Sequence, residues 1–239
     1  MKEPGLSKID VVILCGGKGE RLKEVVKDKP KPMAEVGGRP FLDILIKPLE
    51  GYGFRRFILC AGYKGEMIRN YYAGKHGSSQ ILTLLENKPL GTGGALKNAE
   101  SVVKSNPFLV ANGDSLCPID YSKFAEFHFE KKALYSMAVV KMPGNQDGGL
   151  VSVDDQWRIM RFNEKAKSEK AGYVNAGVYF LDRKIFEVIE GGKKTSLERD
   201  IFPRLIGKNF YGYLAGNKLT DIGTPARYAK AREDLNNAI

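Results

Sequence analysis

Short apolar runs alternate with helically spaced segments through the first half of the chain. The runs VVIL, RFILCA, ILTLL and FLVAN, at residues 11–14, 56–61, 81–85 and 108–112, are strand-like, and helical spacing lies between them. Alternation of this kind is typical of β-α-β units, whose strands are parallel and buried on both faces. The pattern therefore predicts an α/β fold in which helices cover both sides of a sheet.

Two segments of the first half have clear helical spacing. Residues 94–103 place Ala95, Ala99, Val102 and Val103 on one face, so we expect a helix there. Residues 40–53 have the same spacing but contain Pro48. Because a proline inside a helix removes a backbone hydrogen bond, we expect a kink or an early end at that point.

Two later segments carry signals for the start of a helix. In residues 224–235, Thr224 is the expected N-cap and Pro225 the first helical residue. In residues 195–202, Thr195 and Glu198 have the spacing of a capping box.

The second half of the chain has a different pattern of predicted elements. From about Leu134 onward, residues 134–142, 148–154, 157–164 and 173–182 read as strands separated by turns without long helices. This half is expected to extend the sheet and to build a rim around a pocket. We find no linker, internal repeat or low-complexity tract, so we expect a single domain over residues 1–239, with one half at about 1–133 and the other at about 134–239.

Composition narrows the classes of protein. The 239-residue chain is 43% hydrophobic, enough for a sizeable core, and carries a formal net charge of +10. The excess of Lys and Arg favours anionic partners, but these residues are scattered rather than gathered in a tail. Nucleic acid is not an expected partner, because stripes of basic residues interleaved with aromatic ones are missing from the sequence.

Cysteine and histidine usage argues against metal-thiolate or triad chemistry. Cys15, Cys60 and Cys117 have no CxxC spacing and are expected to be buried reduced thiols. Only His76 and His128 could serve a zinc site or a Ser-His-Asp triad. The sequence has no apolar run of 18 residues, and its first ten residues lack the apolar core of a signal peptide, so we expect no membrane partner and a cytoplasmic location.

Glycines and cations follow the first apolar run. Gly16, Gly17 and Gly19 come directly after it, Arg21 follows, and Lys31 stands between two prolines. Such glycines let backbone N–H groups approach an anionic ligand closely, and stiffly placed cations suit a triphosphate. The chain has neither GxxxxGK[ST] nor the third glycine of the dinucleotide fingerprint, which argues against a P-loop and against a nicotinamide dehydrogenase.

Six motifs occur in order between residues 16 and 225: GGKGERL…PKPM, ENKPLGTGGAL, NGDSL, FNEK, VNAGVY and LTDIGTP. In this order and spacing they resemble the sugar nucleotidyltransferases, and among these the short bacterial D-glycero-α-D-manno-heptose 1-phosphate guanylyltransferases. The resemblance implies a Rossmann-like three-layer α/β/α sandwich with a mixed, mostly parallel sheet. It also implies a reaction of a nucleoside triphosphate with a sugar 1-phosphate that requires Mg²⁺, with Mn²⁺ as an alternative ion, and releases pyrophosphate.

The same resemblance implies roles for individual residues. The residues that correspond to the triphosphate loop and its Lys-Pro element are Gly16, Gly17, Gly19, Arg21 and Lys31, and those of the base-contacting stretch are Glu86, Gly91 and Thr92. Leu14 and Asp114 also belong to the implied nucleotide site. Asp114 and Asp221 correspond to two metal carboxylates. Around the sugar 1-phosphate the matching residues are Gly149, Glu164, Lys165 and Asn175. The residues that would then carry the chemistry are Arg21 and Lys31 at the triphosphate, Asp114 and Asp221 at the metal ion, and Lys165 at the acceptor phosphate.

Two departures from the family pattern bear on the substrates. Glu20 stands where many relatives have Thr, and an acid beside a triphosphate would repel it unless the side chain turns outward or meets Arg21 or Lys23. Gly148 stands where relatives often have a larger residue, which would leave the acceptor pocket more open.

The sequence leaves alternatives for base, sugar and class of protein. A carboxylate at Glu86 can accept two hydrogen bonds from N1–H and N2–H₂ of guanine, which favours GTP, whereas backbone groups of residues 90–94 would read the base if Glu86 is only a solvated strand end. CTP, UTP or dTTP with a hexose 1-phosphate is the alternative substrate pair. A nucleotide-binding regulatory subunit without activity is the alternative class. Monomer and homodimer are both open.

Overall fold

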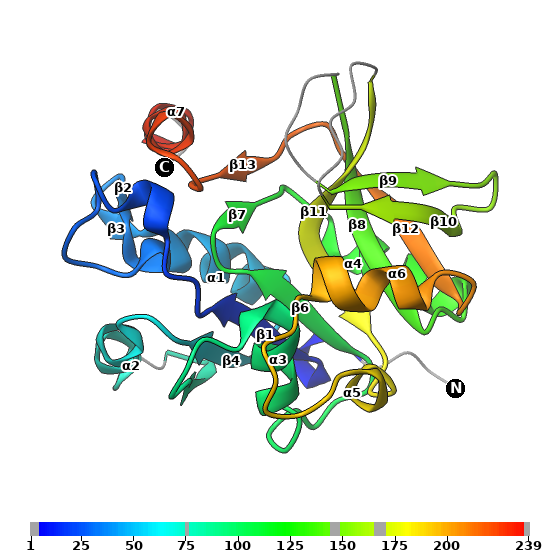
Figure 1. The fold of residues 1–239 in the computed structure, drawn as a ribbon, viewed down its shortest axis with the longest axis horizontal. Helices are drawn as coiled ribbons and strands as arrows, with labels where there is room; N and C mark the ends of the chain where they lie inside the picture. The colour runs from blue at the N-terminus through cyan, green and yellow to red at the C-terminus, as the bar shows by residue number, and fades with distance from the viewer. Residues whose placement is uncertain (1–4, 75–76, 144–148, 165–170, 237–239) are drawn as a thin grey trace.

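The computed structural model describes residues 5–74, 77–143, 149–164 and 171–236. Its centre is a nine-stranded sheet built from strands of both halves of the chain (Figure 1). The first half contributes β1 (Asp10–Cys15), β4 (Arg56–Ala61), β5 (Gln80–Leu85) and β6 (Phe108–Asn112). The second half contributes β8 (Tyr135–Met142), β9 (Leu150–Val153), β10 (Ile159–Asn163), β11 (Gly172–Leu181) and β12 (Phe210–Gly216).

The sheet is parallel on one side and mixed on the other. β1 pairs in parallel with both β4 and β6, and β5 is parallel to β4. β11 then runs antiparallel to β6 and also pairs with β8 and β9, so the sheet divides there, with β12 beside β8 and β10 beside β9. The expected extension of the sheet by the second half is what the structure shows.

The remaining elements are helices and short ribbons. The α-helices are α1 (Phe41–Gly51), α2 (Gly65–Tyr72), α3 (Gly91–Asn98), α4 (Tyr121–Glu130), α5 (Ile185–Val188), α6 (Phe202–Leu205) and α7 (Pro225–Asn236). Tighter or wider turns form η1 (Leu6–Lys8), η2 (Glu20–Leu22), η3 (Lys31–Met33) and the π-helical η4 (Leu197–Ile201). Two-stranded ribbons pair β2 (Glu35–Val36) with β3 (Arg39–Pro40) and β7 (Ser115–Leu116) with β13 (Thr220–Asp221).

Alternate residues of β1 divide the core into two layers. Val11 and Ile13 point into a cluster that contains residues of α1, α2, α4 and α7, whereas Val12 and Leu14 point into one that contains residues of α3, α5, η4 and α6. Successive side chains of a strand face opposite sides of a sheet, so a strand buried on both faces requires a cover on each. The expected three-layer α/β/α sandwich with a mixed sheet is thereby confirmed.

Several local expectations are confirmed and others are corrected. Thr224 Oγ1 accepts a hydrogen bond from Arg227 N at 3.3 Å, so Thr224 caps α7 as expected. α1 continues three residues past Pro48, because that side chain is exposed and the packing of Leu45 and Leu49 holds the helix on both sides of it. α3 begins at Gly91, three residues before the expected start, and ends at Asn98.

The expected capping box at Thr195 and Glu198 is wrong. Ser196 is the cap, since its Oγ accepts from Arg199 N at 3.2 Å. Glu198 is instead buried, with Oε2 accepting from Thr92 Oγ1 at 2.6 Å and from Ser196 Oγ at 2.8 Å. The Glu198 carboxylate therefore binds Thr92 of α3 and does not cap the helix, contrary to the local sequence pattern.

The cysteine expectation is confirmed, because Cys15, Cys60 and Cys117 are free and buried. Within the described ranges, the helices are too short or too polar to cross a membrane.

Candidate active site

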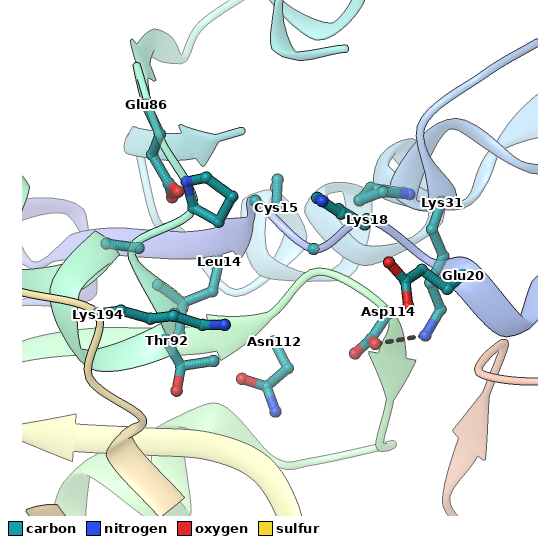
Figure 2. Close-up of a pocket in the computed structure, with 16 residues that line it drawn as sticks. Leu14, Cys15, Lys18, Glu20, Lys31, Glu86, Thr92, Asn112, Asp114 and Lys194 are labelled. Carbon is teal, nitrogen blue, oxygen red and sulfur yellow. Dashed lines mark hydrogen bonds and ion pairs between the residues drawn. The ribbon is translucent and has the colours of Figure 1, made fainter. Parts of the chain in front are cut away.

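A cavity of about 450 Å³ opens at the carboxyl ends of β1 and β6, beside the start of α3 (Figure 2). Open α/β sheets bind ligands at this edge, where loops leave the parallel strands. The predicted residues that line the cavity are Leu14, Gly16, Gly17, Lys31, Glu86, Gly91, Thr92 and Asp114. The fold thus brings together residues that lie up to a hundred positions apart in the chain.

The glycine loop leaves β1 through a narrow space at Gly16, whereas Gly17 has open space around it. A Cβ on Gly16 would lie 2.5 Å from Glu86 Oε1, and one on Gly62 would lie 2.6 Å from the Gly16 carbonyl oxygen. Gly19 has φ of +59°, a conformation that glycine adopts at little cost. The glycines therefore let the loop pass between Glu86 and Lys31 with its backbone facing the cavity.

Lys31 and Asp114 form the charged end of the cavity. Lys31 Nζ lies 2.6 Å from Asp114 Oδ2, with side chains 12% and 43% exposed respectively. The lysine follows Pro30 in η3, whose Pro32 and Met33 are buried, so its backbone is held in place. A part-buried ammonium beside a carboxylate is a geometry that can exchange partners when phosphate oxygens or a metal ion arrive.

Asp221 lies beside this end through the β7–β13 ribbon, but it is not among the residues that line the cavity. In this ribbon Asp221 pairs with Ser115, and Ile222 N donates to the Asp114 carbonyl oxygen at 3.1 Å. Asp221 Oδ2 lies 3.2 Å from an Nη of Arg227. The ribbon therefore joins two carboxylates from residues more than a hundred positions apart.

Arg21 lies at this end too, but outside the cavity wall. A Cβ on Gly223 would be 3.5 Å from Lys31 Nζ and 3.6 Å from an Nη of Arg21, which puts both cations beside the start of α7. Gly19, like Arg21, is not among the lining residues. Glu20 does line the cavity, so the outward turn that would remove its charge from a triphosphate is not observed.

Asp114 and Asp221 are suitable ligands for a hard divalent cation. Mg²⁺ typically takes one or two carboxylates and completes its shell with water and substrate phosphates. Among the described residues, clusters of three or more His, Cys, Asp or Glu side chains able to hold a metal are missing. Asp114 and Asp221 supply the two carboxylates of such a shell, so the donor set fits an ion that also binds water and phosphate oxygens.

Glu86 forms the opposite end of the cavity. Its Oε1 is buried without a hydrogen-bond partner, whereas Oε2 accepts from Leu90 N at 3.3 Å. Burial raises the pKa of this carboxyl group, and the hydrogen bond from Leu90 offsets only part of the rise. A buried carboxylate oxygen without a partner is costly, so a ligand donor that reached Glu86 would stabilise the site.

Gly91 and Thr92 line the cavity and also hold a segment of the second half. Gly91 has φ of +71°, and a Cβ there would lie 2.5 Å from the Thr195 carbonyl oxygen. Thr92 Oγ1 donates to Glu198 and accepts from Leu197 N at 2.8 Å. The hydroxyl of Thr92 therefore has its hydrogen-bond partners within the protein.

The acceptor residues predicted in the second half lie together. A Cβ on Gly149 would be 2.6 Å from Glu164 Oε2, and Asn175 N donates to the Gly149 carbonyl oxygen at 2.9 Å. Asn175 Nδ2 donates to Tyr179 Oη at 2.8 Å. Burial, helped by the nearby Glu198, raises the pKa of Glu164 to about 7, although Arg199 acts to lower it.

Two predictions on this side lie outside the described residues. These are Lys165, assigned to the acceptor phosphate, and Gly148, assigned to an open pocket.

Sequence reasoning did not single out Asn112, Lys18 and Lys194 as site residues, yet all three line the cavity (Figure 2). Asn112 Oδ1 is buried without a hydrogen-bond partner. The position of Asn112 at the end of β6, two residues before Asp114, is a signal that could have identified it. Lys194 comes from the loop before η4 and carries no such signal.

Taken together, the fold and the cavity define an α/β nucleotide-binding protein that gathers cations, glycines and two carboxylates at one end of a cleft. Residues 10–238 match the Nucleotidyl transferase family, and the chain belongs to that family.

Relatives with similarity along nearly the whole chain include two guanylyltransferases. D-glycero-α-D-manno-heptose 1-phosphate guanylyltransferase of Aneurinibacillus thermoaerophilus is 36% identical over 232 residues, which cover 97% of this chain and 100% of that protein. Mannose-1-phosphate guanylyltransferase of Mycobacterium tuberculosis is 31% identical over 97% of this chain and 66% of that protein.

Solved structures agree with the family. The crystal structure of HddC from Yersinia pseudotuberculosis is 36% identical and superposes with a TM-score of 0.83 over 95% of this chain and 99% of that one. HddC complexed with GMP-PN gives a TM-score of 0.82 at the same identity and coverage.

Proposed function

We propose that this protein joins GTP to a D-glycero-α-D-manno-heptose 1-phosphate, giving the guanosine diphosphate sugar and pyrophosphate. The names of the heptose enzyme relatives and the HddC complex with GMP-PN support both the base and the sugar. The alternative bases and the hexose acceptor have less support, because these relatives match over nearly their full lengths. The intact carboxylates, lysine and glycine loop oppose a role as an inactive regulatory subunit.

The observation that carries the choice of GTP is the unpaired oxygen of Glu86. Guanine offers N1–H and N2–H₂ as neighbouring donors, and a carboxylate accepts both in parallel. Uracil and thymine offer one N–H between two carbonyls, and cytosine offers an acceptor at N3, so each leaves Glu86 partly unpaired. Glu86 stands over Gly16 at the end of the cavity away from Lys31 and Asp114, which is where the base of a bound triphosphate would lie.

The reaction requires an oxygen of the sugar phosphate to attack the α-phosphorus of GTP in line with the bond to pyrophosphate. The new P–O bond forms as that bond breaks, and pyrophosphate leaves with its electron pair. Since both GTP and the sugar phosphate are anions, the protein acts mainly by aligning the two substrates and by neutralising their charge. Lys31 and Arg21 lie where they can stabilise the leaving pyrophosphate, and the backbone of the glycine loop can donate to its oxygens.

Asp114 and Asp221 would hold a divalent metal ion at the charged end. When bound, Mg²⁺ or Mn²⁺ supplies positive charge to phosphate oxygens at the reacting centre. To hold the ion, Asp114 and Asp221 would have to give up their ion pairs with Lys31 and Arg227, and Lys31 would then be free to contact the phosphates. Gly149, Glu164 and Asn175, with Lys165, form the proposed acceptor site, and the free cysteines favour a reducing cytoplasm as the place of reaction.

Glu86→Gln should blunt the preference for GTP. The amide keeps the size of the side chain but puts a donor where N1–H or N2–H₂ needs an acceptor, so we expect about a tenfold loss in kcat/KM for GTP and little change for UTP. Glu100→Gln, which alters an exposed carboxylate paired with Lys97, is the matched control and should leave the preference unchanged. An unaltered ratio of GTP to UTP use in Glu86→Gln would mean that backbone groups read the base.

Glu164→Gln should remove a pH dependence of acceptor use. With its pKa raised to about 7 by burial, the carboxyl group ionises near neutrality, and only the ionised form accepts hydrogen bonds with both oxygens. KM for the sugar 1-phosphate should therefore fall from about pH 6 to about pH 8, more steeply in the native enzyme than in Glu164→Gln. In Glu164→Gln, the pH dependence of KM reflects the titration of the substrate phosphate without that of Glu164. Identical dependence of KM on pH in the native enzyme and the variant would exclude Glu164 from acceptor binding.

A further inference from the structure

The segment 193–197, here called the strap, carries a lysine into the cavity from the second half of the chain. Thr195 fixes its course: Thr195 N donates to the Leu90 carbonyl oxygen at 2.8 Å, and its own carbonyl oxygen accepts from Gly93 N at 2.8 Å and from Gly94 N at 3.2 Å. Leu197 N donates to Thr92 Oγ1 at 2.8 Å. Hydrogen bonds therefore hold the strap across the start of α3.

The glycines of α3 make this close approach feasible. A Cβ on Gly94 would lie 2.6 Å from the Lys193 carbonyl oxygen, and Gly91 allows the same for Thr195. The backbone on both sides of Lys194 is thus held against α3. The position from which the Lys194 side chain starts is set by the fold rather than by a free loop.

The side chain of Lys194 points into the cavity (Figure 2). It extends past Thr92 toward Asn112, with Glu86 on one side of it and Asp114 on the other (Figure 2). Within the ranges that the structure describes, Lys194 has no hydrogen bond or ion pair. Its neighbour Lys193 instead pairs with Glu190 at 2.8 Å, both side chains being more than 60% exposed.

We propose that Lys194 contacts the α-phosphate of the bound nucleotide; this rests on the proposed function. In a nucleoside triphosphate the α-phosphate separates the base and ribose from the two phosphates that leave. If the base lies at Glu86 and the leaving phosphates lie at Lys31, the α-phosphate lies in the middle of the cavity, within the reach of Lys194. A lysine ammonium is a mobile point charge with three donors, which suits a phosphate group whose charge grows during attack.

The position of the α-phosphate in the reaction predicts which KM values a Lys194 variant changes. The α-phosphate is in the triphosphate substrate and in the nucleotide-sugar product, but not in pyrophosphate. Lys194→Ala should therefore raise KM about tenfold for GTP in the forward direction and for the nucleotide sugar in the reverse direction. KM for pyrophosphate should stay within twofold of the native value, and Lys194→Arg should recover most of the loss.

Lys193→Ala is the matched control, because it removes the neighbouring charge from the same strap and should leave all three KM values unchanged. A Lys194→Ala variant with native KM for both nucleotides, or with a loss confined to pyrophosphate or to the sugar 1-phosphate, would overturn the assignment.

Binding measurements separate this proposal from the proposed function. By calorimetry, Lys194→Ala should weaken binding of GTP and GMP about tenfold and leave binding of guanosine, which lacks a phosphate, unchanged. If the native protein binds GTP but transfers it to no sugar phosphate, the proposed function fails while the comparison of GMP with guanosine still decides the role of Lys194. Equal losses for GMP and guanosine would show that the lysine contacts the nucleoside instead.

Discussion

Asp114→Asn and Asp221→Asn should each lower kcat by roughly a hundredfold or more while the fold stays intact. An amide keeps the shape of the carboxylate but loses the negative charge that holds a divalent ion at the transferring phosphate. Asp114 lies 2.6 Å from Lys31 and Asp221 lies 3.2 Å from Arg227, and the β7–β13 ribbon joins the two carboxylates. Steady-state pyrophosphate release with Mg²⁺ and with Mn²⁺ measures the effect.

Asp120→Asn is the control for this chemical change. Asp120 caps α4 by accepting from Lys123 N at 3.1 Å, and asparagine caps helices about as well. This variant should keep native activity, and all three variants should melt cooperatively near the native temperature. Native turnover of Asp114→Asn and Asp221→Asn in the presence of chelator would contradict the metal assignment.

Lys31→Ala should reduce use of the triphosphate by about ten- to hundredfold, which corresponds to about 1.5–3 kcal/mol for a hydrogen bond to a charged phosphate. Lys31 is only 12% exposed and is held by η3 beside Asp114, so bulk solvent screens its charge little. Losses should appear in kcat/KM for the nucleoside triphosphate and in KM for pyrophosphate in the reverse direction. Use of the sugar 1-phosphate should change less.

Lys29→Ala is the matched variant, because Lys29 is in the same segment but forms an exposed pair with Glu35. Exposed pairs of this kind contribute little, so activity should be near native. If Lys31→Ala and Lys29→Ala lost activity equally, the net charge of the segment would explain the effect and Lys31 would have no specific role.

The strands of the first half could be predicted because their signal is local. β4 and β6 have the bounds expected from their apolar runs, since each is buried on both faces and ends where polar or glycine residues begin. The expected start of α3 is later than the observed one because the apolar face that indicates the helix begins only at Ala95. The contact of Thr195 with the first turn of α3 stabilises a helical start that glycine alone disfavours.

The site residues that could be predicted from the sequence are those that belong to its motifs. Motifs named Glu86, Asp114 and Lys31, and the fold brings all three to one cavity. Lys194 could not be found in this way, because its place depends on where the strap crosses α3, a contact between residues about a hundred positions apart. The inward position of Glu20 likewise depends on the path of the loop after Gly19 rather than on its sequence neighbours.

The most direct test of the central claim is the release of pyrophosphate from ATP, GTP, CTP and UTP, each with a panel of sugar 1-phosphates. The panel should contain D-glycero-α-D-manno-heptose, mannose and glucose 1-phosphates, with Mg²⁺ throughout, and product masses should identify the nucleotide sugar. We expect the highest kcat/KM for GTP with the heptose 1-phosphate and a guanosine diphosphate heptose as product. Tenfold better use of CTP or UTP than of GTP would contradict the assignment of the base, and a strong preference for glucose 1-phosphate would contradict that of the sugar.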